Sequence, residues 1–206
     1  MQTTIKPICF VAGHSAGHIL PAITLAQKET VPVFFISSSK PLDKQILDPH
    51  HFLKKKYFLK TNKNKYLKSF VIIAALLKCI AILWKNKPSK IVTTAGLVAV
   101  PVCLAAKLMH IPFEIYELNV EPGRATKLLA PFCSKIITCF KETQKHLPKN
   151  KCHMGTYPVR FTNKDKNLDK TEILKELGLN SNQKTIFVLG GSQGSIGINK
   201  LISNAA

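Results

Sequence analysis

Acidic residues are scarce in this sequence. It has 11 Asp and Glu against 30 Lys and Arg, a formal net charge of +19, and no acid between Asp48 and Glu114, where twelve lysines fall. So positive a field favours an anionic partner, either nucleic acid or an anionic membrane surface. A codon bias toward Lys and Asn would give the same composition, so charge alone leaves the partner open.

Paired cysteine motifs and a secretory signal are also absent. The six cysteines form no C-x-x-C pair and have no histidines at zinc-site spacing, which excludes the common zinc modules. Most of them lie in apolar runs, which is typical of reduced core thiols in a cytosolic-type compartment. The apolar run between Lys6 and Gly13 is too short for the hydrophobic region of a signal peptide.

No apolar run is long enough for a bilayer-spanning helix. The most apolar stretch, SFVIIAALLKCIAILW at residues 69–84, carries Lys78 in its middle and is shorter than the roughly 20 residues that a span needs. Flanking lysines and Trp84 are typical of a helix that lies on an anionic membrane surface. A core crossover helix that ends before Pro88 is the alternative, and both hold if only one face is buried.

Strand and helix patterns alternate along the chain and predict an α/β fold with a doubly wound, Rossmann-like parallel sheet. The expected strands are residues 8–12, 31–37, 90–94, 112–116, 135–139 and 185–189, and the expected helices are 19–27, 98–109, 125–129, 171–177 and one from about 196. A polar linker after residue 160 predicts two domains, 1–160 and 161–206. The second is too short to bury a core, so we expect it to be incomplete.

The first strand leads into a turn of small residues, AGHSAGH at residues 12–18. Backbone N–H groups at the start of a helix can bind phosphate or an oxyanion. His14 and His18 add side chains of a type that moves protons near neutral pH. The alternative is a tight strand–helix turn with surface histidines.

Two further stretches have ligand-binding chemistry. Glu117 and Asn119 follow a predicted strand, where ligands of parallel sheets bind, although they could instead cap the next helix. A second small-residue turn, GGSQGS, occupies residues 190–195.

Residues 54–65 are basic with interleaved aromatics, which would suit single-stranded nucleic acid, but no recognised nucleic-acid motif surrounds them.

These motifs together resemble the MurG family, the bacterial N-acetylglucosaminyltransferases of peptidoglycan synthesis in glycosyltransferase family 28. The family's G-G-T-G-G-H-x-x-P-A corresponds to the segment 12–22, H-E-Q-N-x-x-x-G to 116–123, G-N-P-V-R to 155–160 and G-G-S-Q-G-A to 190–195. The resemblance covers nearly the whole chain in order. His14 stands where the family has glycine, and Tyr116 where it has histidine.

The resemblance implies a GT-B arrangement of two Rossmann-like domains. Residues 1–160 would form the acceptor and membrane-side domain, and 161–206 the start of the donor-binding domain. The implied reaction moves N-acetylglucosamine from UDP-N-acetylglucosamine to the 4-hydroxyl of the muramoyl sugar of lipid I, with inversion, to give lipid II. It implies no cofactor and no metal, and the sequence has no D-x-D motif. The implied location is peripheral, on the anionic cytoplasmic face of the inner membrane, with no nucleic-acid partner.

Site residues follow from the same resemblance. His18 would be the base for the acceptor hydroxyl, and Glu117 a second catalytic residue on the acceptor side. The implied contacts to the nucleotide sugar and its diphosphate are Ser15, Ala16, Gly17, Asn119, Arg160 and Ser192. An inactive or split membrane-docking partner of such an enzyme, and a basic nucleic-acid-binding protein, are the alternative functions.

Overall fold

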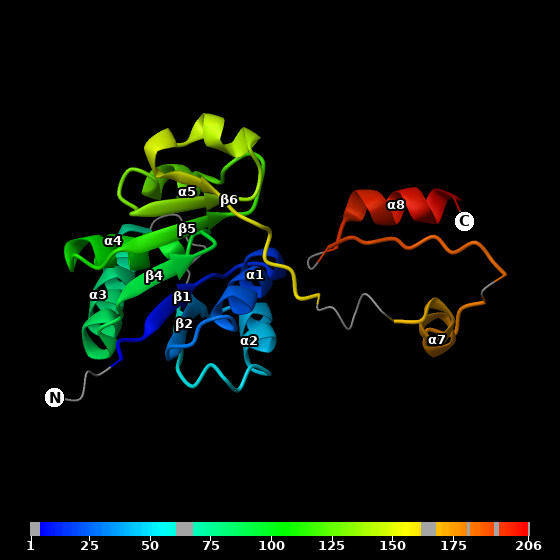
Figure 1. The fold of residues 1–206 in the computed structure, drawn as a ribbon, viewed down its shortest axis with the longest axis horizontal. Coiled ribbons are helices and arrows are strands. Elements are labelled where there is room, and N and C mark those ends of the chain that lie inside the picture. Colours follow the sequence, from blue (N-terminus) through cyan, green and yellow to red (C-terminus); the bar gives the residue numbers. More distant parts are fainter. Residues whose placement is uncertain (1–4, 61–67, 162–167, 181, 192–193, 206) are drawn as a thin grey trace. The chain divides into compact units, whose positions relative to one another are not determined.

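The chain folds into two compact units, Met1–Pro158 and Val159–Ala206. The computed structural model describes residues 5–60, 68–161, 168–180, 182–191 and 194–205. Figure 1 shows the helices and strands of both units, each of which is treated by itself below. The sequence placed the boundary after residue 160.

The first unit is an α/β layer structure around a parallel sheet. Its seven strands lie in the order β3-β2-β1-β4-β5-β6-β7, and all six neighbouring pairs are parallel. The strands are β1 (Ile8–Val11), β2 (Val33–Ser38), β3 (Lys56–Leu59), β4 (Lys90–Thr93), β5 (Phe113–Glu117), β6 (Lys135–Thr138) and β7 (Cys152–Met154). The helices are α1 (Ala16–Ala26), α2 (Pro41–Leu47), α3 (Lys68–Asn86), α4 (Ala99–Leu108) and α5 (Arg124–Leu129), with 3-10 turns η1 (Glu142–His146) and η2 (Lys149–Lys151). The predicted doubly wound fold is confirmed.

Alternate side chains of the central strand enter two separate cores. Cys9 and Val11 pack with buried residues of α3, α4 and α5, whereas Ile8 and Phe10 pack with buried residues of α1 and α2. Because successive strand residues point to opposite faces, a strand covered by helices on both faces must be apolar throughout. This is why the run at residues 8–12 has no polar residue.

Some elements differ from the sequence prediction. The basic and aromatic stretch 54–65 contains strand β3, at one edge of the sheet, and α2 was not predicted. Helix α1 begins at Ala16 instead of residue 19, because the Ser15 carbonyl already accepts hydrogen bonds from the N–H groups of His18 and Ile19, each at 3.2 Å. The helix therefore starts directly at the small-residue turn.

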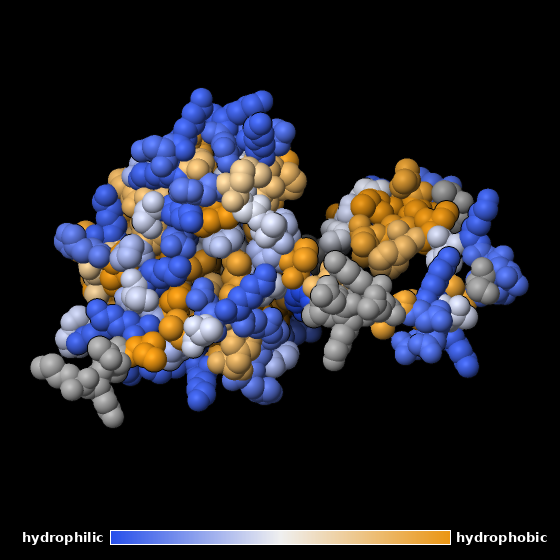
Figure 2. All heavy atoms as spheres, in the orientation of Figure 1, coloured by the Kyte–Doolittle hydropathy of each residue, from blue (hydrophilic) through white to orange (hydrophobic). Residues whose placement is uncertain are grey.

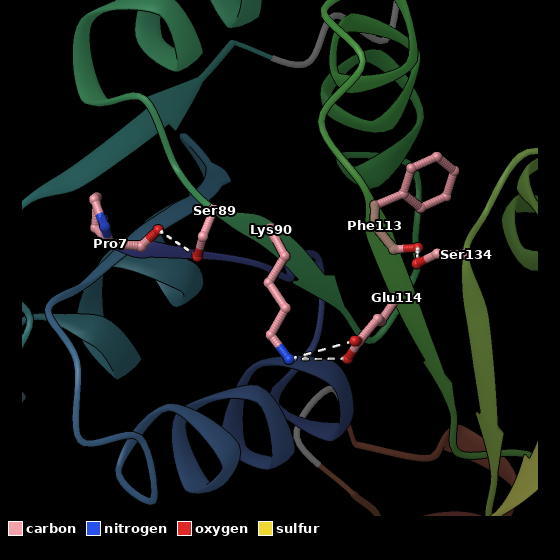
Figure 3. Close-up of polar contacts among 6 residues, drawn as sticks. All are labelled: Pro7, Ser89, Lys90, Phe113, Glu114 and Ser134. Atoms are coloured by element: carbon pink, nitrogen blue, oxygen red, sulfur yellow. Dashed lines mark hydrogen bonds and ion pairs between the residues drawn. The ribbon is translucent and has the colours of Figure 1, made fainter. Parts of the chain in front are cut away.

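Polar links join neighbouring strands at the amino edge of the sheet (Figure 3). The Ser89 hydroxyl donates to the Pro7 carbonyl at 3.3 Å, and the Ser134 hydroxyl donates to the Phe113 carbonyl at 2.9 Å. Between them, Lys90 on β4 reaches across to Glu114 on β5, with Nζ 3.2 Å from Oε2. The polar side chains at the amino edge of the sheet therefore stabilise the pairing of neighbouring strands.

The second unit contains helices α7 (Lys170–Glu176) and α8 (Ile196–Ala205). The strand predicted at 185–189 is not formed: residues 184–191 have no regular secondary structure, and Ile186, Phe187 and Leu189 are exposed. A strand needs a neighbour to pair its backbone groups, and the described part of this unit offers none. No described residue of the unit is buried, as expected for a domain too short to form a core.

Candidate active site at the switch point of the sheet

The strand order reverses direction between β1 and β4, and the loops after these two strands meet there. Parallel sheets bind ligands outside the carboxyl ends of the strands at such a switch point. A Cβ atom on Gly13, after β1, would lie 3.1 Å from Cγ1 of Val98, and one on Gly96, after β4, would lie 3.5 Å from the Gly13 carbonyl. The two loops are therefore in direct contact.

Two threonines at the end of β4 fix the turn after β1. The Thr93 hydroxyl donates to the Val11 carbonyl at 2.8 Å, and the Thr94 hydroxyl donates to the His18 carbonyl at 2.9 Å. The second bond joins the first turn of α1 directly to β4. The backbone of His18 is thus tied to the residue that directly follows β4.

The His18 side chain is half-buried at the start of α1. Its Nδ1 atom is buried and has no hydrogen-bond partner among the described residues. A buried polar atom without a partner is costly, by about 1–3 kcal/mol, and is therefore uncommon except where function requires it. His18, the residue predicted to act as a base, thus has a ring nitrogen without a hydrogen bond to the described part of the chain.

Ser15, Ala16 and Gly17 form the start of α1, with Ser15 as the N-cap residue. None of the three is buried. The Ser15 side chain makes no capping hydrogen bond, so it does not occupy the first N–H groups of the helix. Accessible N–H groups at the positive end of a helix of 11 residues suit an anionic group.

His14 lies in the same turn with φ of +76°, in the left-handed region. Its backbone N–H donates to both carboxylate oxygens of Asp43, at 3.2 and 3.0 Å. Burial lowers the pKa of its imidazole below the usual value, and the charge of Lys40 lowers it further, while Asp43 opposes both effects. The neutral imidazole is therefore favoured.

Asp43 was not identified from the sequence. It is fully buried in the first turn of α2, and its carboxylate accepts hydrogen bonds from the end of β2 and from the His14 turn. One signal could have found it: it is an isolated acid just after SSSKP, in a strongly basic chain. Its partners come from another loop, which the sequence does not reveal.

Glu117 and Asn119 follow β5, next to β4 at the same edge of the sheet. The Glu117 carboxylate is buried and accepts hydrogen bonds from the backbone and side-chain N–H groups of Asn119 at 3.0 and 2.9 Å. It also accepts from Gly123 N–H at 3.2 Å and from the Thr126 hydroxyl. Glu117 thus holds the loop before α5, although the N-cap residue of that helix is Gly123, without a side-chain capping bond, and Asn119 is exposed.

Two predicted site residues, Arg160 and Ser192, fall outside the first unit. Arg160 is exposed and belongs to the second unit, so the structure describes it only there. Ser192 lies outside the described residues. In the described ranges, no group of three or more His, Cys, Asp or Glu side chains is placed to hold a metal ion.

Comparison with known proteins assigns the sheet to a family. The model of the glycosyltransferase family 28 N-terminal domain matches residues 8–138, which include all strands from β1 to β6. The chain belongs to glycosyltransferase family 28. Its switch-point turn, with His18, and its Glu117 loop both lie within the matched family 28 domain.

Two curated relatives share the name UDP-N-acetylglucosamine--N-acetylmuramyl-(pentapeptide) pyrophosphoryl-undecaprenol N-acetylglucosamine transferase. The Staphylococcus carnosus protein is 31% identical over 95% of this family 28 chain, and the Protochlamydia amoebophila protein is 34% identical over 98% of it. This chain spans about half of each relative, 56% in both cases.

A solved structure shows the same fold. Acinetobacter baumannii MurG matches 96% of this family 28 chain and 55% of its own, with a TM-score of 0.70 at 19% sequence identity. The likeness confirms the expected Rossmann-like, GT-B type of architecture. At this identity it shows the fold alone.

Proposed function

We propose that this chain supplies the acceptor-side part of an inverting transferase, which moves N-acetylglucosamine from UDP-N-acetylglucosamine to the 4-hydroxyl of lipid I, giving lipid II. The observation that carries the proposal is the switch-point turn of a family 28 domain, in which His18 Nδ1 has no hydrogen-bond partner among the residues that the structure describes. The name that the two curated relatives share supports the same donor and acceptor.

His18 accepts the proton of the acceptor hydroxyl in this proposal. As the hydroxyl oxygen attacks the anomeric carbon, the bond to the UDP oxygen breaks and the proton passes to the imidazole. A positioned base of this kind contributes roughly 10²- to 10⁴-fold to a rate. Thr94 holds the His18 carbonyl and therefore helps to fix where the base stands.

The start of α1 would stabilise phosphate charge. The N–H groups of Ser15, Ala16 and Gly17 bind a diphosphate oxygen, and the helix dipole adds to the attraction. Asn119 and Arg160 bind the nucleotide sugar, and Ser192 does the same from the second small-residue turn. Glu117 serves the acceptor side, and its hydrogen bonds to Asn119 suit a role in positioning that loop. No metal or cofactor takes part in this proposal.

Helix α3 would bind the membrane. Its exposed side chains include Ile73, Leu77 and Trp84, and Lys78 and Lys85 are exposed beside them. An apolar helix face flanked by lysines suits the surface of an anionic bilayer. None of the described helices is long and apolar enough to cross a membrane. The proposed location, peripheral on the cytoplasmic side of the inner membrane, is supported by the exposed apolar and basic side chains of α3.

A hybrid enzyme tests the reaction. Residues 1–206 are followed by the remaining C-terminal part of the Staphylococcus carnosus relative, since this chain matches only 56% of that protein. Transfer of radiolabelled N-acetylglucosamine to lipid I is measured for the hybrid and for the chain alone. We expect transfer by the hybrid and none by residues 1–206 alone, because no described residue of their second unit is buried.

Replacing His18 by Ala in the hybrid should lower kcat by about 10²- to 10⁴-fold. H153A, at an exposed histidine in β7, is the matched control and should retain the activity of the parent hybrid. Circular dichroism confirms that both variants are folded. An H18A hybrid as active as H153A would refute the role of His18, and a folded hybrid without transfer would refute the reaction.

A further inference from the structure

The buried carboxylate of Asp43 connects three segments at the switch point. Its Oδ2 atom accepts hydrogen bonds from His14 N–H at 3.0 Å, from Ser38 N–H at 3.2 Å and from the Ser38 hydroxyl at 2.5 Å. The Ser37 hydroxyl lies 2.9 Å from the same atom and 2.7 Å from the Ala12 carbonyl, so its single proton serves one of the two. The carboxylate thus joins the β1 turn, the end of β2 and α2.

Space around this carboxylate is tightly filled. A Cβ atom on Gly13 would lie 2.8 Å from Asp43 Oδ2 and 3.1 Å from the Ser38 backbone nitrogen. Contacts this close leave no freedom for the turn to shift relative to the carboxylate. Asp43 therefore determines where residues 13 and 14 lie.

The bond to His14 stabilises an unfavourable backbone conformation. A residue with a Cβ atom is less stable in the left-handed region than in the right-handed one. His14 has φ of +76°, and its N–H is held by the buried carboxylate. A hydrogen bond to a charged group is stronger than one between neutral groups, so the bond to Asp43 offsets the cost of this conformation.

The backbone conformation of His14 affects the position of the proposed base, His18. Ser15 follows His14. The Ser15 carbonyl accepts hydrogen bonds from the N–H groups of His18 and Ile19, both at 3.2 Å. A different peptide orientation at His14 would move Ser15 and tilt the first turn of α1. The imidazole of His18 would then be misplaced.

We propose that Asp43 is a positioning residue for transfer: it holds the His14 peptide and thereby sets the place of His18 and of the N–H groups at residues 15–17. This inference rests on the proposed function. Asp43 is buried and acts through the turn, so its loss should reduce the rate of the chemical step and leave the binding of the donor nucleotide unchanged.

The D43N variant tests this in the hybrid enzyme. Asparagine keeps the size of the side chain, but its amide nitrogen cannot accept the N–H or O–H bonds that the carboxylate receives. We expect kcat to fall by about 10- to 100-fold, because small misplacements of catalytic groups have effects of this size. The KM for UDP-N-acetylglucosamine should stay within about twofold of its original value.

D48N is the matched control, since Asp48 ends the same helix and is exposed. It should change neither kcat nor the KM for UDP-N-acetylglucosamine.

H14G in the D43N background should recover much of the lost kcat, because glycine adopts the left-handed conformation without the carboxylate. A kcat of D43N within twofold of D48N, or no recovery in H14G/D43N, overturns the proposal. If D43N does not fold, S38A replaces it, with an expected threefold loss of kcat; no loss overturns the proposal.

Amide hydrogen exchange in the chain itself separates this inference from the proposed function. The His14 N–H should exchange at least about tenfold faster in D43N than in D48N, because the hydrogen bond that protects it is lost. Equal exchange overturns the role of Asp43 whether or not the hybrid transfers sugar. A folded wild-type hybrid without transfer, combined with the exchange difference, would instead refute the reaction.

Discussion

Gly13 and Gly17 lie four residues apart in one turn, but their surroundings differ. A Cβ atom on Gly13 would meet Asp43, the Ser38 backbone and Val98 within 3.1 Å, whereas one on Gly17 would meet only the Ser15 hydroxyl, at 3.9 Å. Gly17 is also exposed and lies inside a helix. The sequence presents both as members of one small-residue turn, and only packing separates their roles.

G13A should destabilise the chain, and G17A should stabilise it slightly. We expect G13A to lower the free energy of unfolding by about 1–3 kcal/mol, because the added methyl group overpacks a site bounded by backbone. G17A should raise it by up to about 1 kcal/mol, because alanine favours the helix. Urea unfolding followed by circular dichroism measures both, and equal effects of the two substitutions would contradict this packing.

Helix α3 is the element whose role the sequence left open. Cys79, Ile82 and Leu83 are buried in the core, while Leu77 and Trp84 point outward and are 61% and 71% exposed. One face of the helix therefore belongs to the core, and the opposite face leaves apolar side chains exposed, so the membrane-surface role stays a prediction. Figure 2 shows hydrophobic and hydrophilic side chains interspersed over the visible surface of the first unit, so colour alone does not single out a binding face.

The double variant L77S/W84S should weaken membrane binding. Removing two exposed apolar side chains from the proposed contact should lower partitioning into vesicles of phosphatidylcholine and phosphatidylglycerol by at least about tenfold. Flotation of the chain with these vesicles measures the bound fraction. L128S, at an exposed leucine of α5, is the control and should bind as the parent does. Equal binding of all three proteins would exclude docking through α3.

The six cysteines of the first unit differ in how deeply they are buried. Cys9, Cys79, Cys103 and Cys133 are buried, whereas Cys139 and Cys152 are partly exposed. Burial raises the pKa of Cys79 to about 12 and holds the pKa values of Cys9 and Cys103 well above the usual value. Thiols in such surroundings stay protonated and inert.

The native chain should therefore expose two cysteines to a thiol reagent. With Ellman's reagent at pH 8 we expect Cys139 and Cys152 to react first, more slowly than a free thiol because burial raises both of their pKa values. The other four should react only on unfolding in urea. C152A should remove one equivalent from the early phase. An early phase of more than two equivalents would contradict the packing of the first unit.

The strands with the clearest apolar runs were the ones that the sequence predicted correctly. The runs at residues 90–94 and 112–116 gave β4 and β5 to within about a residue, because a strand buried on both faces needs continuous apolar residues. Strand β3 was missed because an edge strand tolerates the lysines of residues 54–65. The strand predicted at 185–189 failed because an apolar run needs a neighbouring strand, and none is described there.

The sequence by itself determined the alternation of strands and helices, the small-residue turn at residues 12–18 and the resemblance that singled out His18. These depend on periodicity and on the order of residues along the chain. Only the tertiary structure decided that Asp43 supports that turn, that Glu117 is occupied within its own loop, and that α3 has one buried and one exposed face. Each of these depends on contacts between segments that lie apart in sequence, or on which face of an element another covers, and neither is encoded in local order.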